Sequence, residues 1–346
     1  MSQKTWIRIL VIMTILIAAS SFYYLPYYVT KPGSAKDLDP IIEVEDGYED
    51  EGKLMLTTVR MGKANIYAYL LASFRKYEHI YPVEEIRSSE ETDEEYNVRQ
   101  LHLMESSKLN AIEVAFEHAD KSYSFHYNGV YVLNVYDGMP AAEVLEPGDM
   151  ITAIDGQEFS SSQEFIDYIN GKKVGDSVDV TFTREGRTQE EEIPLAEFTA
   201  SQGKIGLGIG LVDDKEIITD PKVTMNTEKI GGPSAGLMFS LQIYNELVER
   251  DITHGMEIAG TGTISSNGTV GRIGGIEQKV IAADKAGAEI FFAPMDIIPD
   301  SLRKSNPDLE PNYKEALKTA EEIGTDMKIV PVKKFDDALT YLDSIK

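Results

Sequence analysis

The chain has 346 residues, a formal net charge of −25 and no cysteine. This length is sufficient for two domains. The acidic balance argues against a nucleic-acid partner, because phosphates attract Lys and Arg. Without cysteine, the chain cannot form a disulfide, a thiolate nucleophile or a cysteine-based zinc site. We expect no metal and no organic cofactor.

The N-terminal residues predict a membrane segment. Lys4 and Arg8 precede an uncharged run from Ile9 to Thr30, which as one helix would span about 30 Å, the thickness of a bilayer core. Positive charge before such a span favours a cytoplasmic N-terminus. We therefore predict a cytoplasmic segment at 1–8, a transmembrane anchor at 9–29, and an extracellular body.

A cleaved signal peptide is the alternative interpretation of the same stretch. Ala18-Ala19-Ser20 offers small residues for cleavage after an apolar region. Pro26 also disfavours the last turn of a long helix. Either interpretation predicts that the rest of the chain is exported.

The next segments predict a linker followed by a mixed region. Residues 30–52 are rich in Pro, Gly and acidic residues, which is typical of a linker. Residues 53–61, KLMLTTVRM, predict a strand, and residues 64–77 and 87–119 have helical spacing of their apolar residues. We group 53–119 as one segment.

The middle of the chain predicts a compact β-rich module. Strands are expected at 129–137 and 149–159, a short helix at 161–170, and a hairpin at 177–195. The stretch 138–159, GMPAAEVLEPGDMITAIDGQEF, resembles a PDZ domain, which we place at 120–198.

The resemblance to a PDZ domain implies that this module binds extended peptides by adding a strand to a sheet edge. The stretch YNGVYV takes the place of the family's carboxylate-binding loop but departs from its usual Gly-Leu-Gly-Phe type. By position, Gly129, Val130 and Tyr131 are the expected peptide-binding residues, and Tyr131 would serve equally well in the core.

The segment 199–346 alternates strands and helices, and it contains Gly232-Pro233-Ser234-Ala235-Gly236. A GxSxG motif can be a nucleophile elbow, which requires a histidine later in the chain. Of the five histidines only His254 follows Ser234. The predicted helix between them is about 25 Å long, so it carries His254 away, and a Ser-His-Asp triad is disfavoured. A turn and helix cap is a second interpretation.

A Ser-Lys dyad is the third interpretation of Ser234. Lysine acts as a base only when it is neutral, which requires burial or nearby positive charge. Lys279 lies on a predicted helix, 274–288, where its neighbours Ile276, Ala282 and Ala283 are small or apolar. No carboxylate on this face would hold the ammonium form. A solvated surface lysine is the alternative.

Together, the stretches GGPSAG and GGIEQKVIAA resemble the proteolytic domain of Lon-type proteases. The resemblance covers about 140 residues and implies that Ser234 is the nucleophile and Lys279 the general base. It places Gly232 and Pro233 in the oxyanion region and matches Thr261 to a threonine that contacts the lysine.

Two positions depart from the family pattern and leave details of the pocket open. Gly231 stands where an acidic residue is frequent, and Gln278 stands where Glu is common. The segment after residue 53 also resembles the opening strand and helix of the Lon-type domain. If 53–119 belongs to that domain, the PDZ module is inserted within it.

The predicted fold class is α+β, with an N-terminal transmembrane helix, a PDZ domain and a Lon-type proteolytic domain. The whole chain resembles membrane-anchored, PDZ-containing Lon-like proteases of Gram-positive bacteria. The sequence has no GxxxxGK[ST] phosphate-binding loop, so we expect an ATP-independent serine endopeptidase. Its expected partners are the cell membrane and exported peptides or membrane proteins presented through the PDZ groove. A homo-oligomer, an inactive PDZ scaffold and a chaperone-like adaptor stay open.

Overall fold

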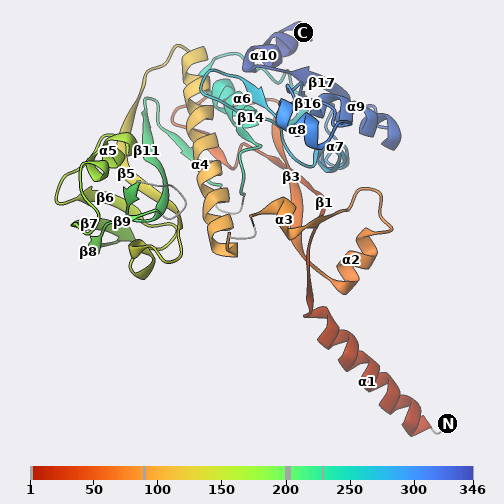
Figure 1. The fold of residues 1–346 in the computed structure, drawn as a ribbon. Coiled ribbons are helices and arrows are strands. Elements are labelled where there is room, and N and C mark those ends of the chain that lie inside the picture. Colours follow the sequence, from red (N-terminus) through yellow and green to blue (C-terminus); the bar gives the residue numbers. More distant parts are fainter. Residues whose placement is uncertain (1–2, 89–90, 199–203, 228–229, 346) are drawn as a thin grey trace.

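The computed structural model describes residues 3–88, 91–198, 204–227 and 230–345. Two sheets organise this part of the chain, one of six strands and one of five. Figure 1 shows them as separate bodies with the long helix α4 (Asp93–His118) between them. We call them the six-stranded body and the five-stranded module.

The six-stranded body is built around the strand order β17-β16-β13-β3-β1-β4. The four strands from β17 to β3 are parallel, whereas β1 and β4 run antiparallel to their neighbours. The strands are β1 (Tyr24–Asp37), β3 (Lys53–Asn65), β4 (His79–Pro82), β13 (Glu257–Gly260), β16 (Ile290–Pro294) and β17 (Lys328–Val332).

Side chains alternate across this sheet, so each face has its own core. On one face Leu54 and Phe292 pack with Phe239 of α6, and on the other Met55 and Phe291 pack with residues of α7 and α9. Strands covered on both faces are apolar throughout, as β16 is. The helices of the body are α2 (Ile66–Ala72), α3 (Val83–Ile86), α4, α6 (Gly236–Leu247), α7 (Ile276–Lys285), α8 (Asp300–Ser305), α9 (Asn312–Ile323) and α10 (Phe335–Ser344).

The five-stranded module has the antiparallel order β11-β5-β6-β7-β8 and an apolar core of its own. It contains β5 (Tyr123–Val135), η1 (Pro140–Glu143), β6 (Met150–Ile154), α5 (Ser162–Asn170), β7 (Ser177–Arg184), β8 (Arg187–Pro194) and β11 (Ile209–Thr219). Three short strand pairs complete the description: β2 (Ile42–Val44) with β12 (Val223–Met225), β9 (Ala196–Glu197) with β10 (Ile205–Gly206), and β14 (Thr263–Ile264) with β15 (Val270–Gly271).

The five-stranded module interrupts the six-stranded body in the chain. Strand β3 precedes the module and β13 follows it, yet Lys53–Leu56 pairs directly with Glu257–Gly260. Residues from both sides of the module therefore share one sheet. We keep the domain boundaries of the sequence analysis as proposals.

The N-terminal segment differs from its prediction. Helix α1 spans Gln3–Ser21 and includes both Lys4 and Arg8, so its uncharged part, from Ile9 to Ser21, is only about 20 Å long. From Tyr24 onward the uncharged run belongs to β1, which pairs with β3 and β4. The expected linker at 30–52 likewise contains part of β1 and all of β2.

Within the described residues, no helix combines the length and the apolar character that a bilayer crossing needs. About 30 Å of apolar helix would be required. The predicted transmembrane helix at 9–29 is therefore wrong, as is the single-pass location in the cell membrane that was inferred from it. The mixed α+β architecture is confirmed.

Candidate active site

Ser234 lies in a tight loop directly before α6. The loop turns at Gly232, whose φ of 83° is in the left-handed region that favours glycine. Helix α6 begins at Gly236 with Ala235 as its N-cap, and no side chain caps it. Ser234 therefore does not serve as the expected helix cap, and its hydroxyl is available for another contact.

That contact is Lys279. Its Nζ lies 2.7 Å from Oγ of Ser234 and 2.9 Å from Oγ1 of Thr261. The lysine is 3% exposed, and within the described part of the chain no carboxylate forms an ion pair with it. Burial disfavours the charged ammonium form and lowers the pKa of Lys279 to about 7. Lys279 is therefore neutral in a large share of the protein molecules near pH 7.

Thr261 orients the lysine through its own hydrogen bonding. Its hydroxyl donates to the backbone carbonyl of Ser234 at 2.9 Å. Because the hydroxyl proton of Thr261 already takes part in this hydrogen bond, Oγ1 of Thr261 acts as an acceptor toward Lys279. One N–H of the neutral amine then points to Thr261, which leaves the amine lone pair for the proton of Ser234.

The histidines lie elsewhere. His254 Nε2 is 3.1 Å from the carbonyl of Leu342, and none of the described residues that line the cavity at Ser234 is a histidine. His79 pairs with Glu277, and His118 pairs with Asp336. The structure therefore offers no Ser-His-Asp arrangement at the GxSxG motif.

Ser234 and Lys279 line a cavity of about 540 Å³. One wall is strand β3 from Leu56 to Met61, and the others come from β1, α3, α4 and the start of α7. The described residues give β3 no strand partner on the β13 side beyond Leu56. This wall therefore contains backbone that could pair with an extended ligand.

Gln278, next to the lysine, supports the frame of the site. Its Nε2 donates to Oγ1 of Thr30 at 3.0 Å and to the carbonyl of Tyr77 at 3.1 Å. These bonds connect α7 to β1 and to the segment before β4. The sequence departure at Gln278 therefore acts here as a structural link rather than as a charge beside Lys279.

The oxyanion-region residues have distinct places. The N–H of Gly232 donates to the carbonyl of Gln100 on α4 at 3.1 Å, and Pro233 has no N–H. Among the described residues, the backbone N–H groups of Ser234 and Ala235 have no hydrogen-bond acceptor. These two N–H groups are therefore available as donors directly before α6.

The residues expected to bind peptide in the module do not lie at a sheet edge. Val130 pairs with Asp213 of β11 on one side and with Ile151 of β6 on the other. Gly129 and Tyr131 lie on the same interior strand, so these three positions cannot accept an added strand. The structure moves the candidate edge to β11, which is one of the two outer strands of the sheet and is paired with β5.

The sequence contained a signal for this edge. Gly206-Leu207-Gly208 directly precedes β11 and is closer to a Gly-Leu-Gly-Phe loop than YNGVYV is. Helix α5 is near this strand, because the N–H of Ser162 donates to Oδ1 of Asp213 on β11 at 2.7 Å. The edge of β11 and α5 therefore form the candidate peptide site.

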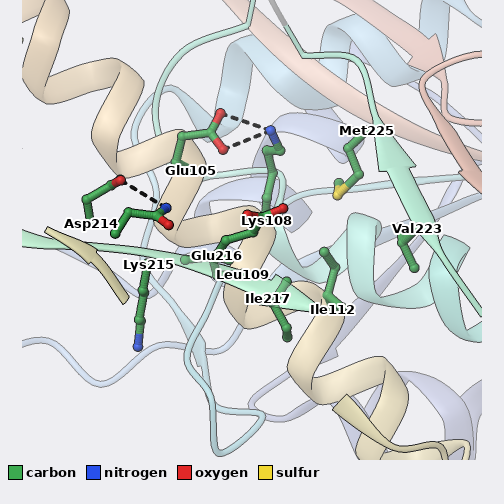
Figure 2. A pocket seen from close by; sticks show the side chains of 11 residues that line it. Glu105, Lys108, Leu109, Ile112, Asp214, Lys215, Glu216, Ile217, Val223 and Met225 are labelled. Carbon is green, nitrogen blue, oxygen red and sulfur yellow. Dashed lines mark hydrogen bonds and ion pairs between the residues drawn. The ribbon is translucent and has the colours of Figure 1, made fainter. Parts of the chain in front are cut away.

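A second cleft, of about 320 Å³, lies where α4 meets β11 and β12. Figure 2 shows that Lys108 pairs with Glu105, which is also on α4. Asp214 lies on the facing strand β11. Leu109, Ile112 and Ile217 supply part of its apolar lining. None of the residues that line it belongs to the Ser234 cavity.

Two family models match separate parts of the chain. Residues 110–195 match the PDZ domain, and residues 223–342 match the Lon protease (S16) C-terminal proteolytic domain. The chain therefore combines a PDZ domain with a Lon-type proteolytic domain, and these matches support a serine peptidase.

Individual relatives match shorter stretches of the chain. The Lon protease of Metamycoplasma arthritidis is 32% identical over 115 residues, which is 33% of this chain and 12% of that protein. The Lon protease of Campylobacter concisus is 36% identical over 109 residues, which is 31% of this chain and 11% of that protein. The chain thus matches only a small part of the length of these relatives. The crystal structure of the PDZ domain of an SdrC-like protein from Listeria monocytogenes has 49% sequence identity, with a TM-score of 0.24, and covers 25% of this chain and 90% of that one.

Proposed function

We propose that this protein is an ATP-independent serine endopeptidase in which Ser234 is the nucleophile and Lys279 the general base. The observation that carries the proposal is the 2.7 Å contact between Ser234 Oγ and a buried lysine whose pKa is lowered to about 7. A general base is most effective when its pKa is close to the working pH.

The reaction proceeds by two acyl-transfer steps. Neutral Lys279 takes the hydroxyl proton of Ser234 as Oγ attacks the peptide carbonyl carbon. The resulting ammonium gives that proton to the nitrogen of the leaving amine, the C–N bond breaks, and an ester with Ser234 remains. Lys279 then deprotonates a water molecule that attacks the ester, and Ser234 recovers its proton.

Negative charge develops on the carbonyl oxygen in both steps. The N–H groups of Ser234 and Ala235 at the start of α6 are placed to donate to it. Unpaired N–H groups at a helix N-terminus carry partial positive charge. Donors fixed in advance of the reaction stabilise the transition state more than the ground state.

The substrate is an extended segment of peptide or unfolded protein. A strand added along β3 near Val59 and Met61 would pass through the Ser234 cavity. The sequence has no GxxxxGK[ST] motif, so we propose cleavage without ATP-driven unfolding. The candidate site at β11 and α5 holds another part of the substrate and thereby selects it.

The test compares the full chain with Ser234→Ala on casein and on a mixture of unstructured peptides, with mass spectrometry of the products. We expect cleavage by the wild type alone, at the same rate with and without ATP. Ser265→Ala, which removes an exposed serine hydroxyl in the turn between β14 and β15, is the matched control. Equal product patterns for wild type and Ser234→Ala would reject the peptidase and favour a binding scaffold.

A further inference from the structure

Helix α4 contacts the serine loop at two points, although it is far from that loop in the sequence. The carbonyl of Gln100 accepts the N–H of Gly232 at 3.1 Å. About two turns further along α4, Oγ of Ser107 donates to the carbonyl of Pro233 at 3.1 Å. Ser107 is 3% exposed, and it does not line the cavity.

The second contact fixes the orientation of a peptide plane. The bond between Pro233 and Ser234 is trans, so its C=O and N–H point in opposite directions in one plane. Because Ser107 draws the Pro233 carbonyl toward α4, the N–H of Ser234 must point away from α4. This N–H is one of the two donors available for the oxyanion.

We infer that Ser107 is a positioning residue that holds the Pro233–Ser234 peptide so that the Ser234 N–H serves as an oxyanion donor. The inference rests on the proposed peptidase function. Ser107 itself touches neither the substrate nor the reacting atoms. Without its hydroxyl, the one donor to the Pro233 carbonyl that remains among the described residues is the N–H of Gly236 at 3.4 Å, which is a long bond.

The surroundings of Ser107 leave little room for a substitute. A Cβ added at Gly236 would lie 2.8 Å from Ser107 Oγ, so the two helices α4 and α6 meet closely here. Such close packing also means that no side chain with more non-hydrogen atoms than serine could take over the contact at position 107 without displacing α6.

The experiment uses the full chain and the variants Ser107→Ala and Ser107→Cys. Ser106→Ala is the matched control, because Ser106 is on the same helix and its Oγ is 3.4 Å from His102 Nε2 rather than near the serine loop. Removing an oxyanion donor outright costs about 10²- to 10³-fold in kcat. A donor that is only loosened should therefore cost about tenfold or more.

We expect Ser107→Ala to lower kcat about tenfold or more, with KM within about twofold of the wild-type value and an unchanged midpoint in the pH profile. A peptide aldehyde, whose adduct with Ser234 places an oxygen at the oxyanion position, should bind more weakly by a similar factor. Ser107→Cys should be intermediate because a thiol is a weak donor, and Ser106→Ala should match the wild type.

Each other result overturns the inference. These results are an unchanged kcat in Ser107→Ala, an equal loss in Ser106→Ala, a rise in KM without a fall in kcat, or a shifted pH midpoint. If Ser107→Ala does not fold, Ser107→Cys takes its place in the test. A kcat of Ser107→Cys equal to that of the wild type then overturns the inference. Ser234→Ala is assayed alongside: if it equals the wild type, the peptidase proposal fails, whereas an inactive Ser234→Ala with a fully active Ser107→Ala rejects Ser107 alone.

Discussion

The six-stranded body and the five-stranded module each contain a lysine with a strongly altered pKa, and the two shifts are opposite. In the body, burial lowers the pKa of Lys279 to about 7. In the module, the hydrogen bond to Asp155 raises the pKa of Lys172 well above its usual value. Lys172 Nζ is 2.7 Å from an Asp155 oxygen and also lies over the ring of Tyr168.

The difference comes from the partners each region provides. Lys279 has two hydroxyl oxygens as partners and is nearly inaccessible to water, so its neutral form is favoured. Lys172 has a carboxylate and access to solvent, so its charged form is favoured. One lysine can therefore act as a base near neutral pH, while the other can only be a structural cation.

The largest expected effect is the loss of the base when Lys279 is replaced by arginine. Lys279→Arg should lower kcat by about 10³-fold, because a guanidinium does not deprotonate in proteins and general bases contribute about 10²- to 10⁴-fold. Lys172→Arg keeps the charge beside Asp155 and should cleave as fast as the wild type. Steady-state peptide cleavage measures both, and comparable losses in the two variants would contradict the comparison.

The next effect concerns the orientation of the base. Thr261→Val keeps the side-chain shape but removes the acceptor for Lys279 and the donor to the Ser234 carbonyl. The free energy of such hydrogen bonds corresponds to a factor of about 10 to 100 in a rate. We therefore expect kcat to fall by a factor of that size. Thr319→Val, which removes another buried hydroxyl on α9, is the control for stability, and full activity of Thr261→Val would speak against orientation by Thr261.

A third expectation is the pH dependence of cleavage. Lysine is a base only above its pKa, so kcat/KM should rise by about tenfold between pH 6 and pH 8 for a group with a pKa near 7. The rise should persist in Lys172→Arg, because the charge of that residue does not change in this range. A profile that is flat from pH 5 to 9 would exclude Lys279 as the base.

The smallest effect is on stability, where the two lysines should again differ in sign. Between pH 7 and 10.5, Lys279 is protonated more often in the unfolded chain than in the native chain. The free energy of unfolding therefore decreases as the pH falls through this range. Lys279→Met should therefore raise the Tm at pH 7 by about 2–5 °C, and the gain should shrink toward pH 10. Lys172→Met should lower the Tm slightly. A fall of Tm in Lys279→Met would show that burial of the lysine is not destabilising.

The sequence contained enough information to bring Ser234 and Lys279 together, because two ordered motifs flanked by small residues predicted one site. Their catalytic roles stay predictions. The contacts of Gln100 and Ser107 had no sequence signal, since they depend on how α4 packs against a loop more than a hundred residues away. Only tertiary structure brings these groups together.

The N-terminus and the module show two other limits of sequence patterns. An uncharged run does not distinguish a helix from a buried strand, and Tyr24–Thr30 is in fact the start of β1. In the module, β11 comes after the hairpin and lies within 199–346, the segment that the sequence assigns to the following domain. Its pairing with β5 across a long chain separation could not be read from local sequence.

The position of β13 between β3 and β16 has a consequence for the order of events during synthesis. The ribosome releases β1 and β3 first, but β13, the neighbour of β3, emerges only after the whole five-stranded module. Lys279 follows later still, on α7. The nascent chain can therefore fold its module before Ser234 and Lys279, the residues of the candidate active site, have both been synthesised. Closing a sheet across so long a loop is also slow, which makes completion of the site a late step in folding.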